Sequence, residues 1–141
     1  MSEYQETIFS KIIAGEIPCH KLYENEHILS FLDIGPLSEG HTLVIPKENA
    51  RYLHELSEPA AAALGAILPK LCRAVKKASG AKSYNVLVNT GESAGQVVMH
   101  VHVHIIPQFP DSGLKKSWNA GSLDDATAQR LSEQIRAYLD E

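Results

Sequence analysis

The segment HVHVHIIP, at residues 100–107, carries three histidines at alternate positions of an otherwise apolar run. Side chains two residues apart project from the same face of a β-strand, with their Cα atoms roughly 6.5–7 Å apart. A strand here would present His100, His102 and His104 on one face and direct the intervening valines and isoleucine into the core. Three imidazoles with no lysine, glutamate or threonine among them indicate a chemical site rather than a solvated strand face.

Two kinds of chemistry fit this spacing. Two histidines at i and i+2 on a strand can share one zinc ion, whereas a neutral imidazole can attack phosphorus or donate a hydrogen bond to phosphate. A catalytic zinc usually needs three protein ligands, and His100 and His104 would lie roughly 13–14 Å apart at Cα. We therefore expect no metal and no cofactor, and we keep metal-dependent phosphohydrolysis as an alternative.

The loop NTGESAGQ, at residues 89–96, directly precedes the histidines. Glycines such as Gly91 and Gly95 let backbone N–H groups approach an anion, and Asn89 and Gln96 can add side-chain donors. Taken alone, such a loop is more often only a hairpin connection. Beside candidate nucleophiles it favours a phosphate ligand over a metal ion.

The elements that would position these residues follow from apolar periodicity and from chain breakers. Strands are predicted at residues 19–23, 27–33, 42–46, 84–89 and 97–106. Helices are predicted at 7–14, from a cap at Ser57 to about Ser79, and from about Ser122 onward. The last helix is expected to turn its apolar side inward, with Leu131, Ile135, Tyr138 and Leu139. Strands joined by short turns predict an antiparallel α+β domain.

The composition limits the classes of function. The chain has 141 residues, 44% of them hydrophobic, and a net charge of −4 without a lysine- or arginine-rich block. We expect one domain that binds neither nucleic acid nor a membrane. Neither a signal-peptide pattern nor a run of about 18 apolar residues appears. Cys19 and Cys72 are too few for a disulfide framework, which favours a cytoplasmic location.

The histidine run resembles the pattern His-φ-His-φ-His-φ-φ of the histidine-triad (HIT) superfamily, where φ is apolar. IFSKIIAGEIP (8–18), FLDIGPLSEGHTLVIPK (31–47) and NTGESAGQ (89–96) are similar to the other landmarks of that family, in the same order. The resemblance covers most of residues 7–108 and is nearest to the nucleoside phosphoramidases and bacterial dinucleoside polyphosphate hydrolases. It implies a single HIT domain over 1–141, with a core at 7–108 and a helical C-terminal extension at 109–141.

The resemblance also implies an activity. The expected enzyme is a two-fold homodimer with a mainly antiparallel five-stranded sheet, a long helix and a C-terminal helix. It would act at the α-phosphate of a purine nucleotide or nucleotide conjugate through a nucleotidyl–histidine intermediate. His102 resembles the nucleophile, His104 the donor to the phosphate or leaving group, and His100 a supporting residue. His41 resembles a fourth histidine packed behind the triad.

The same resemblance assigns the nucleotide contacts. Asp33 would accept hydrogen bonds from the ribose hydroxyls, although such an aspartate is more commonly a turn residue. The apolar clamp around the base would comprise Ile8, Phe9, Leu32 and Ile34. The phosphate side would comprise Asn89, Gly95, Gln96 and Val97.

The chain departs from the family at two positions near the site. Val97 stands where many relatives carry serine or threonine, and Gln108 where many bacterial members carry arginine. Both changes remove a polar contact toward phosphate. A nucleotide-binding module with little turnover is therefore a second alternative to the hydrolase.

Overall fold

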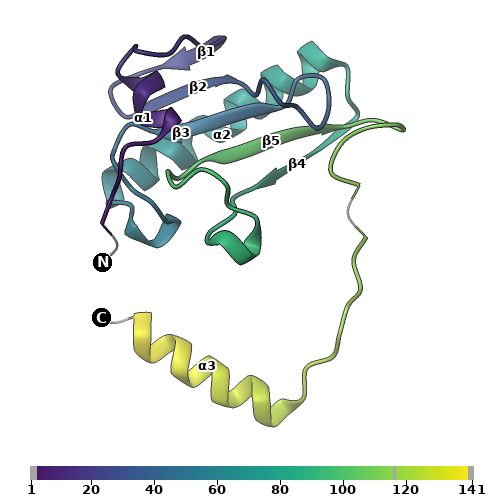
Figure 1. The fold of residues 1–141 in the computed structure, drawn as a ribbon. Helices are drawn as coiled ribbons and strands as arrows, with labels where there is room; N and C mark the ends of the chain where they lie inside the picture. The colour runs from purple at the N-terminus through teal and green to yellow at the C-terminus, as the bar shows by residue number, and fades with distance from the viewer. Residues whose placement is uncertain (1–2, 116, 140–141) are drawn as a thin grey trace.

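The computed structural model describes residues 3–115 and 117–139. Its centre is a five-stranded antiparallel sheet in the order β1-β2-β3-β5-β4 (Figure 1). The strands are β1 (Lys21–Glu24), β2 (Ile28–Leu32), β3 (Thr42–Pro46), β4 (Ser83–Leu87) and β5 (Val103–Gln108). The helices are α1 (Ile8–Ile13), α2 (Glu58–Ser79) and α3 (Asp125–Leu139), with short 3-10 turns at Leu53–Glu55 and Glu92–Ala94. The predicted α+β class with a five-stranded antiparallel sheet is confirmed.

Local capping explains where the first two helices begin and end. The Thr7 hydroxyl accepts from the amides of Phe9 and Ser10, and the Ser10 hydroxyl accepts from the Thr7 amide, which completes a capping box. Ser57 caps α2 through the Ala60 amide. Gly80 ends α2 in the left-handed conformation, at φ +76°, which glycine adopts without steric cost.

The sheet buries both of its faces, and the alternation of side chains decides which element packs on each. Ile28, Val44, Val103 and Ile105 face α2 and pack against a stripe made of Leu64, Ile67, Leu71, Cys72 and Val75. On the opposite face, α1 covers the strands through a cluster formed by Phe9, Leu29, Phe31, Leu43 and Ile45. Side chains of β5 that alternate with Val103 and Ile105 therefore face the α1 side.

The histidine segment corrects one sequence prediction. The predicted strand at 97–106 begins only at Val103 in the structure, so His100 and His102 precede β5 in irregular backbone. Val101 is held by a bond of 2.9 Å from its amide to the carbonyl of Ala50 instead of by a sheet partner. The simple picture of three histidines on one strand face is wrong, although Val101, Val103 and Ile105 are buried as predicted.

The C-terminal helix corrects a second prediction. In Figure 1, α3 lies apart from the sheet at the end of an extended connection. Its residues Leu131, Ile135, Tyr138 and Leu139 are exposed, and none of its described residues is buried. The apolar side predicted to turn inward therefore has no core to join within the chain. Within the described ranges, neither α3 nor any other helix is long and apolar enough to cross a bilayer.

Candidate active site

Two of the triad histidines meet at a cavity on the α1 side of the sheet. His104 is in β5 opposite Leu43 of β3, and its ring centroid lies 4.9 Å from that of His102. The ring of Phe9, from α1, packs edge-on against His102 at 5.0 Å. Both histidines line a cavity of about 370 Å³, which we call the nucleoside cavity after the ligand that the sequence resemblance implies. His100 is not among its lining residues, because its ring is fully buried behind them.

The nucleoside cavity gathers most of the contact residues predicted from the sequence. Its lining includes eight of the nine: Ile8, Phe9, Leu32, Asp33, Ile34, Asn89, Gly95 and Val97. The side chains of Ile34 and Val97 are 85% and 87% exposed, so they form a rim that a ligand could cover. Gln96 does not lie among the lining residues.

Gln96 instead holds the glycine-rich loop in shape. Its side chain is buried, and its Oε1 accepts from the Gly91 amide at 2.8 Å. Its Nε2 donates to the carbonyls of Arg51 at 2.8 Å and Val98 at 3.0 Å. All of these bonds stay within the protein, and they fix the segment that leads to the histidines.

Hydrogen bonds to backbone groups determine which nitrogen of His102 carries the proton. Its Nδ1 lies 2.7 Å from the carbonyl oxygen of His100, which can only accept. Nδ1 must therefore be protonated, and the neutral ring carries its lone pair on Nε2. A side chain in this tautomer can attack an electrophile from Nε2.

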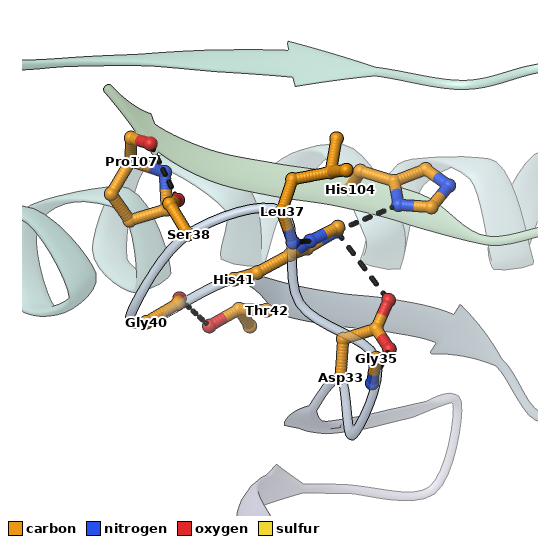
Figure 2. Close-up of polar contacts among 9 residues, drawn as sticks. All are labelled: Asp33, Gly35, Leu37, Ser38, Gly40, His41, Thr42, His104 and Pro107. Carbon is orange, nitrogen blue, oxygen red and sulfur yellow. Dashed lines mark hydrogen bonds and ion pairs between the residues drawn. The ribbon is translucent and has the colours of Figure 1, made fainter. Parts of the chain in front are cut away.

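His41 fixes the opposite tautomer at His104 (Figure 2). The backbone amide of Leu37 donates to Nδ1 of His41 at 3.0 Å, so a neutral His41 carries its proton on Nε2. That Nε2 lies 3.0 Å from Nδ1 of His104, which then accepts. His104 is left with a proton on Nε2, and Figure 2 shows this nitrogen on the side of the ring away from His41. The site thus pairs a lone pair on His102 with a donor on His104.

Burial keeps these rings neutral. Desolvation lowers the pKa of His41, His100 and His102 below the ordinary value. Desolvation, together with repulsion from His102 and His41, lowers the pKa of His104 to about 4. The negative charge of Asp33 acts in the opposite direction and raises the pKa of His41, His102 and His104, but it does not outweigh desolvation. At neutral pH the lone pair on His102 is therefore available.

Asp33 follows β2 and faces both a turn and the histidines. Its Oδ1 accepts from the Gly35 amide at 2.8 Å, and its Oδ2 lies 3.5 Å from Nε2 of His41 (Figure 2). The turn role expected of such an aspartate is present. A carboxylate has about four acceptor positions, so further donors can bind the same group.

A second cavity of about 660 Å³ lies against the same polar residues. Asp33, His41 and His104 line it together with residues of β4 and with two C-terminal apolar residues, Leu114 and Trp118. His104 therefore borders both cavities. Asp33 and Asn89 border both cavities too, so a ligand that spans them would have its junction at these three residues.

Asp33, His41 and His104 also form a set of possible metal ligands that sequence reasoning missed. One ligand atom from each lies within 4.8 Å of the others. The Leu37 amide opposes this use, because it occupies Nδ1 of His41 and places a proton on the Nε2 that would have to ligate. Metal binding would require that hydrogen bond to break. The donor set therefore fits a hydrogen-bonded chain better than a metal site.

Other cavity residues also escaped sequence reasoning. Ile12, Ile17, Pro18, Cys19, Phe31, Leu43 and Val98 line the nucleoside cavity as well. The segment IFSKIIAGEIP already contained five of the cavity residues, including Ile17 and Pro18, but an apolar pattern alone does not distinguish a binding wall from a core. Tyr4, which contacts His100, had no signal in the sequence.

An α+β fold with an antiparallel sheet, in which one imidazole with a free lone pair and one donor imidazole lie two positions apart at the start of a strand, is typical of the histidine-triad class of protein. The comparisons with known proteins agree, since a family model described as the HIT domain matches residues 14–111. The chain belongs to the HIT family.

Three relatives illustrate the likeness. The chain is 48% identical over 133 residues to "Adenosine 5'-monophosphoramidase hnt1" of Schizosaccharomyces pombe, covering 94% of this chain and 97% of the relative. It is 48% identical over 140 residues to "Adenylylsulfatase HINT3" of Arabidopsis thaliana, covering 95% and 70%. Among solved structures, a HIT family protein from Bacillus anthracis superposes with a TM-score of 0.91 at 36% identity, covering 96% and 99%.

Proposed function

We propose that this chain is a nucleoside phosphoramidase-type hydrolase. It cleaves a nucleoside 5′-monophosphate from an amine, or from a related leaving group, through a covalent nucleotidyl–histidine intermediate. The observation that carries the proposal is the bond of 2.7 Å from Nδ1 of His102 to the carbonyl of His100, which leaves Nε2 free to attack. Relatives named for phosphoramidate and adenylylsulfate hydrolysis support this reaction class.

In the first step, Nε2 of His102 forms a bond to the α-phosphorus. The bond from phosphorus to the leaving nitrogen breaks, and His104 donates its Nε2–H to the phosphate or to the leaving group. A preorganised donor at the place where charge develops stabilises the transition state. Phe9 packs against the His102 ring and restricts its orientation.

In the second step, water attacks phosphorus and displaces His102. The hydroxyl of that water goes to the nucleoside monophosphate, and its remaining proton is released to solvent, which balances the proton that the amine takes up from solvent as it leaves. The ring of His102 returns to its neutral form, which burial favours. No metal ion enters either step.

The nucleoside would occupy the cavity between α1 and β2. Apolar walls that include Ile8, Phe9 and Leu32 suit a flat purine base, and Asp33 provides acceptors for the ribose diol. Asn89 and Gly95 line the same cavity near His102, on the phosphate side. The leaving group would extend past His104 toward the second cavity.

Turnover of adenosine 5′-phosphoramidate by wild type and His102→Ala tests the proposal. The variant should lose turnover but keep its affinity for adenosine monophosphate within about tenfold, or roughly 1.4 kcal/mol. Quenching wild type under mildly alkaline conditions should reveal a mass increase of one adenylyl group on His102. His54→Ala, an exposed histidine on a 3-10 turn, is the matched control and should keep full activity.

Measurements of affinity, turnover and adduct formation, together with chelation by EDTA, separate the alternatives. A binding module would retain affinity without turnover or adduct in wild type. A metal-dependent phosphohydrolase would lose activity in EDTA and recover it with added zinc. Full activity after exhaustive chelation supports the histidine nucleophile.

We further propose that the enzyme is a homodimer that uses α2 and neighbouring strands. The face of α2 opposite the core exposes small or apolar residues, which let another helix approach closely: Ala61, Ala62, Gly65, Ala66 and Pro69. Closed two-fold symmetry is the commonest arrangement of homo-oligomers. Sedimentation at micromolar concentration should give the mass of two chains.

A substitution on this face tests the interface. Ala66→Arg should shift the sedimenting species toward one chain, because a long charged side chain keeps the helices apart. Ala14→Arg, at the end of α1 on the other side of the sheet, should leave the dimer intact. A wild-type mass of one chain would contradict the proposal.

We also treat residues 1–141 as one HIT domain with a core at 7–108 and an extension at 109–141. The separation of α3 from the sheet in Figure 1 supports this division. A cytoplasmic location is the remaining proposal. It is supported by Cys19 and Cys72, both of which are free thiols.

A further inference from the structure

The N-terminal segment reaches the histidine triad before α1 begins. The hydroxyl of Tyr4 lies 2.7 Å from Nδ1 of His100, 96 positions further along the chain. The two rings are also in edge-to-face contact, with centroids 5.6 Å apart. Tyr4 does not line the nucleoside cavity, so this contact is directed at the protein and not at a ligand.

The environment of His100 explains why this contact is needed. Its ring is completely buried, and its Nε2 lies 2.8 Å from the carbonyl oxygen of Pro46. A carbonyl only accepts, so Nε2 carries the proton and Nδ1 of the neutral ring is an acceptor. Burial lowers the pKa of His100, which keeps the ring in this neutral form. The Tyr4 hydroxyl supplies the donor that this buried nitrogen requires.

The same residue holds the nucleophile through its backbone. The backbone carbonyl of His100 accepts a hydrogen bond from the Nδ1–H of His102 at 2.7 Å. Residues 97–102 precede β5, so no ladder of sheet hydrogen bonds fixes this carbonyl. The ring of His100, tied at one end to Pro46 and at the other to Tyr4, is therefore an anchor for the segment.

We propose that Tyr4 is a positioning residue for the reaction. It fixes the tautomer and orientation of His100, and the carbonyl of His100 then holds His102 with its Nε2 lone pair free. This inference rests on the proposed function for its effect on turnover, and its effect on His102 can be observed without turnover.

Removing only the hydroxyl tests the inference. In Tyr4→Phe, kcat for adenosine 5′-phosphoramidate should fall about tenfold or more, by analogy with the loss when a hydrogen-bond partner that orients a metal-bound imidazole is removed. KM should change little, because Tyr4 lies outside the cavity. Tyr23→Phe is the matched control, because it removes a hydroxyl on β1 that accepts a hydrogen bond from the side chain of Asn25, and it should leave kcat unchanged.

A background variant separates positioning from general stability. If Tyr4 acts through His100, Tyr4→Phe should lower kcat much less in a His100→Ala protein than in wild type. Equal losses in both backgrounds would overturn the proposal. A Tyr4→Phe protein that melts earlier but keeps its kcat would overturn it too.

Nitrogen NMR of ¹⁵N-histidine-labelled protein tests the inference independently of catalysis. Wild type should show His102 protonated on Nδ1 and His100 on Nε2, and Tyr4→Phe should shift His102 toward a mixture of tautomers. An unchanged His102 in the folded variant overturns the proposal, even if the enzyme proves inactive on every substrate. If Tyr4→Phe does not fold, the wild-type spectrum decides, because any other pair of tautomers would contradict the assigned hydrogen bonds.

Discussion

At the scale of single residues, backbone groups assign different chemistry to identical side chains. His102 and His104 are two positions apart, yet the carbonyl of His100 accepts from the Nδ1–H of the first, whereas the Nε2–H of His41 donates to Nδ1 of the second. The backbone amide of Leu37 donates to Nδ1 of His41 and thereby sets the direction of the hydrogen bond from His41 to His104. One ring is therefore left with a lone pair and the other with a donor. The order His-φ-His cannot show this difference, because it depends on the local backbone conformation at His100 and on His41 and Leu37, which lie far away in the sequence.

The pH dependence of turnover follows from the neutral state of His102. Burial lowers its pKa below the ordinary histidine value, and protonation removes the lone pair that attacks phosphorus. We expect kcat/KM to be flat around neutral pH and to fall only in acid, with a midpoint below about 6.5. A profile measured between pH 4 and 8 checks this. Activity that already declines from pH 7.5 to 6.5 would contradict a lowered pKa.

Asp33 can be separated into its two roles by substitution. Asp33→Ala should weaken nucleoside monophosphate binding by roughly 1.5–3 kcal/mol, the range for hydrogen bonds to a charged group. The loss should be smaller for a 2′,3′-dideoxy ligand, which has no diol.

Asp33→Asn provides the control for the turn. In wild type, the Gly35 backbone amide donates to Oδ1 of Asp33 at 2.8 Å. The side-chain oxygen of an asparagine can accept the same hydrogen bond. The asparagine protein should fold like wild type and still bind the diol less tightly. Equal losses for both ligands in titration calorimetry would assign Asp33 to the turn alone.

At the scale of elements, the sequence predicted what local patterns encode. The helix capped by Ser57 and ended near Gly80, and the strand at 42–46, match the structure to within about one residue. Strand β5 was predicted to begin at 97, because His100 and His102 continue its alternation. The ring of His100 instead bonds to Tyr4 and to the carbonyl of Pro46, and the ring of His102 bonds to the carbonyl of His100. Tyr4 and Pro46 come from distant parts of the chain and have no signature in the segment itself.

The inward turn predicted for α3 failed for a related reason. Amphipathic periodicity identifies the helix and its apolar side, but it does not identify what covers that side. The structure leaves Leu131, Ile135 and Tyr138 exposed. Gln96 shows a different error, because a side-chain amide beside glycines was predicted to bind a ligand, whereas its hydrogen bonds go to Gly91 in the loop and to the carbonyls of Arg51 and Val98 outside it.

The role of Gln96 predicts a stability effect. Gln96→Ala would leave the Gly91 amide and the carbonyls of Arg51 and Val98 without their side-chain partners. Urea unfolding should show a loss of roughly 2–4 kcal/mol, the scale of several lost buried hydrogen bonds. Gln129→Ala, which removes a single exposed bond of 3.4 Å on α3, is the control and should change stability little. Similar unfolding of both variants would contradict a buried anchor.

At the scale of the whole molecule, the two faces of the sheet have different roles: one holds the larger apolar core and the other holds the candidate active site. The face under α2 is packed mainly with apolar side chains, whereas the face under α1 contains the histidines together with Phe9. The imidazoles of His41, His100, His102 and His104 lie in or near the face under α1, and their burial has a thermodynamic consequence. Each of them must stay neutral in the folded protein, although the unfolded chain can protonate them freely below about pH 6.5.

Acid should therefore destabilise the protein before its carboxylates titrate. A histidine whose folded pKa is lowered contributes stability above the unfolded value, and that stability is lost as pH falls toward the folded value. His104, with a pKa of about 4, sets the lower end of the window. The melting temperature should fall steadily from about pH 6.5 to 4. In His104→Asn the fall should be shallower, while the exposed control His54→Asn should follow wild type. Parallel curves for all three proteins would show that His104 is not held neutral by the fold.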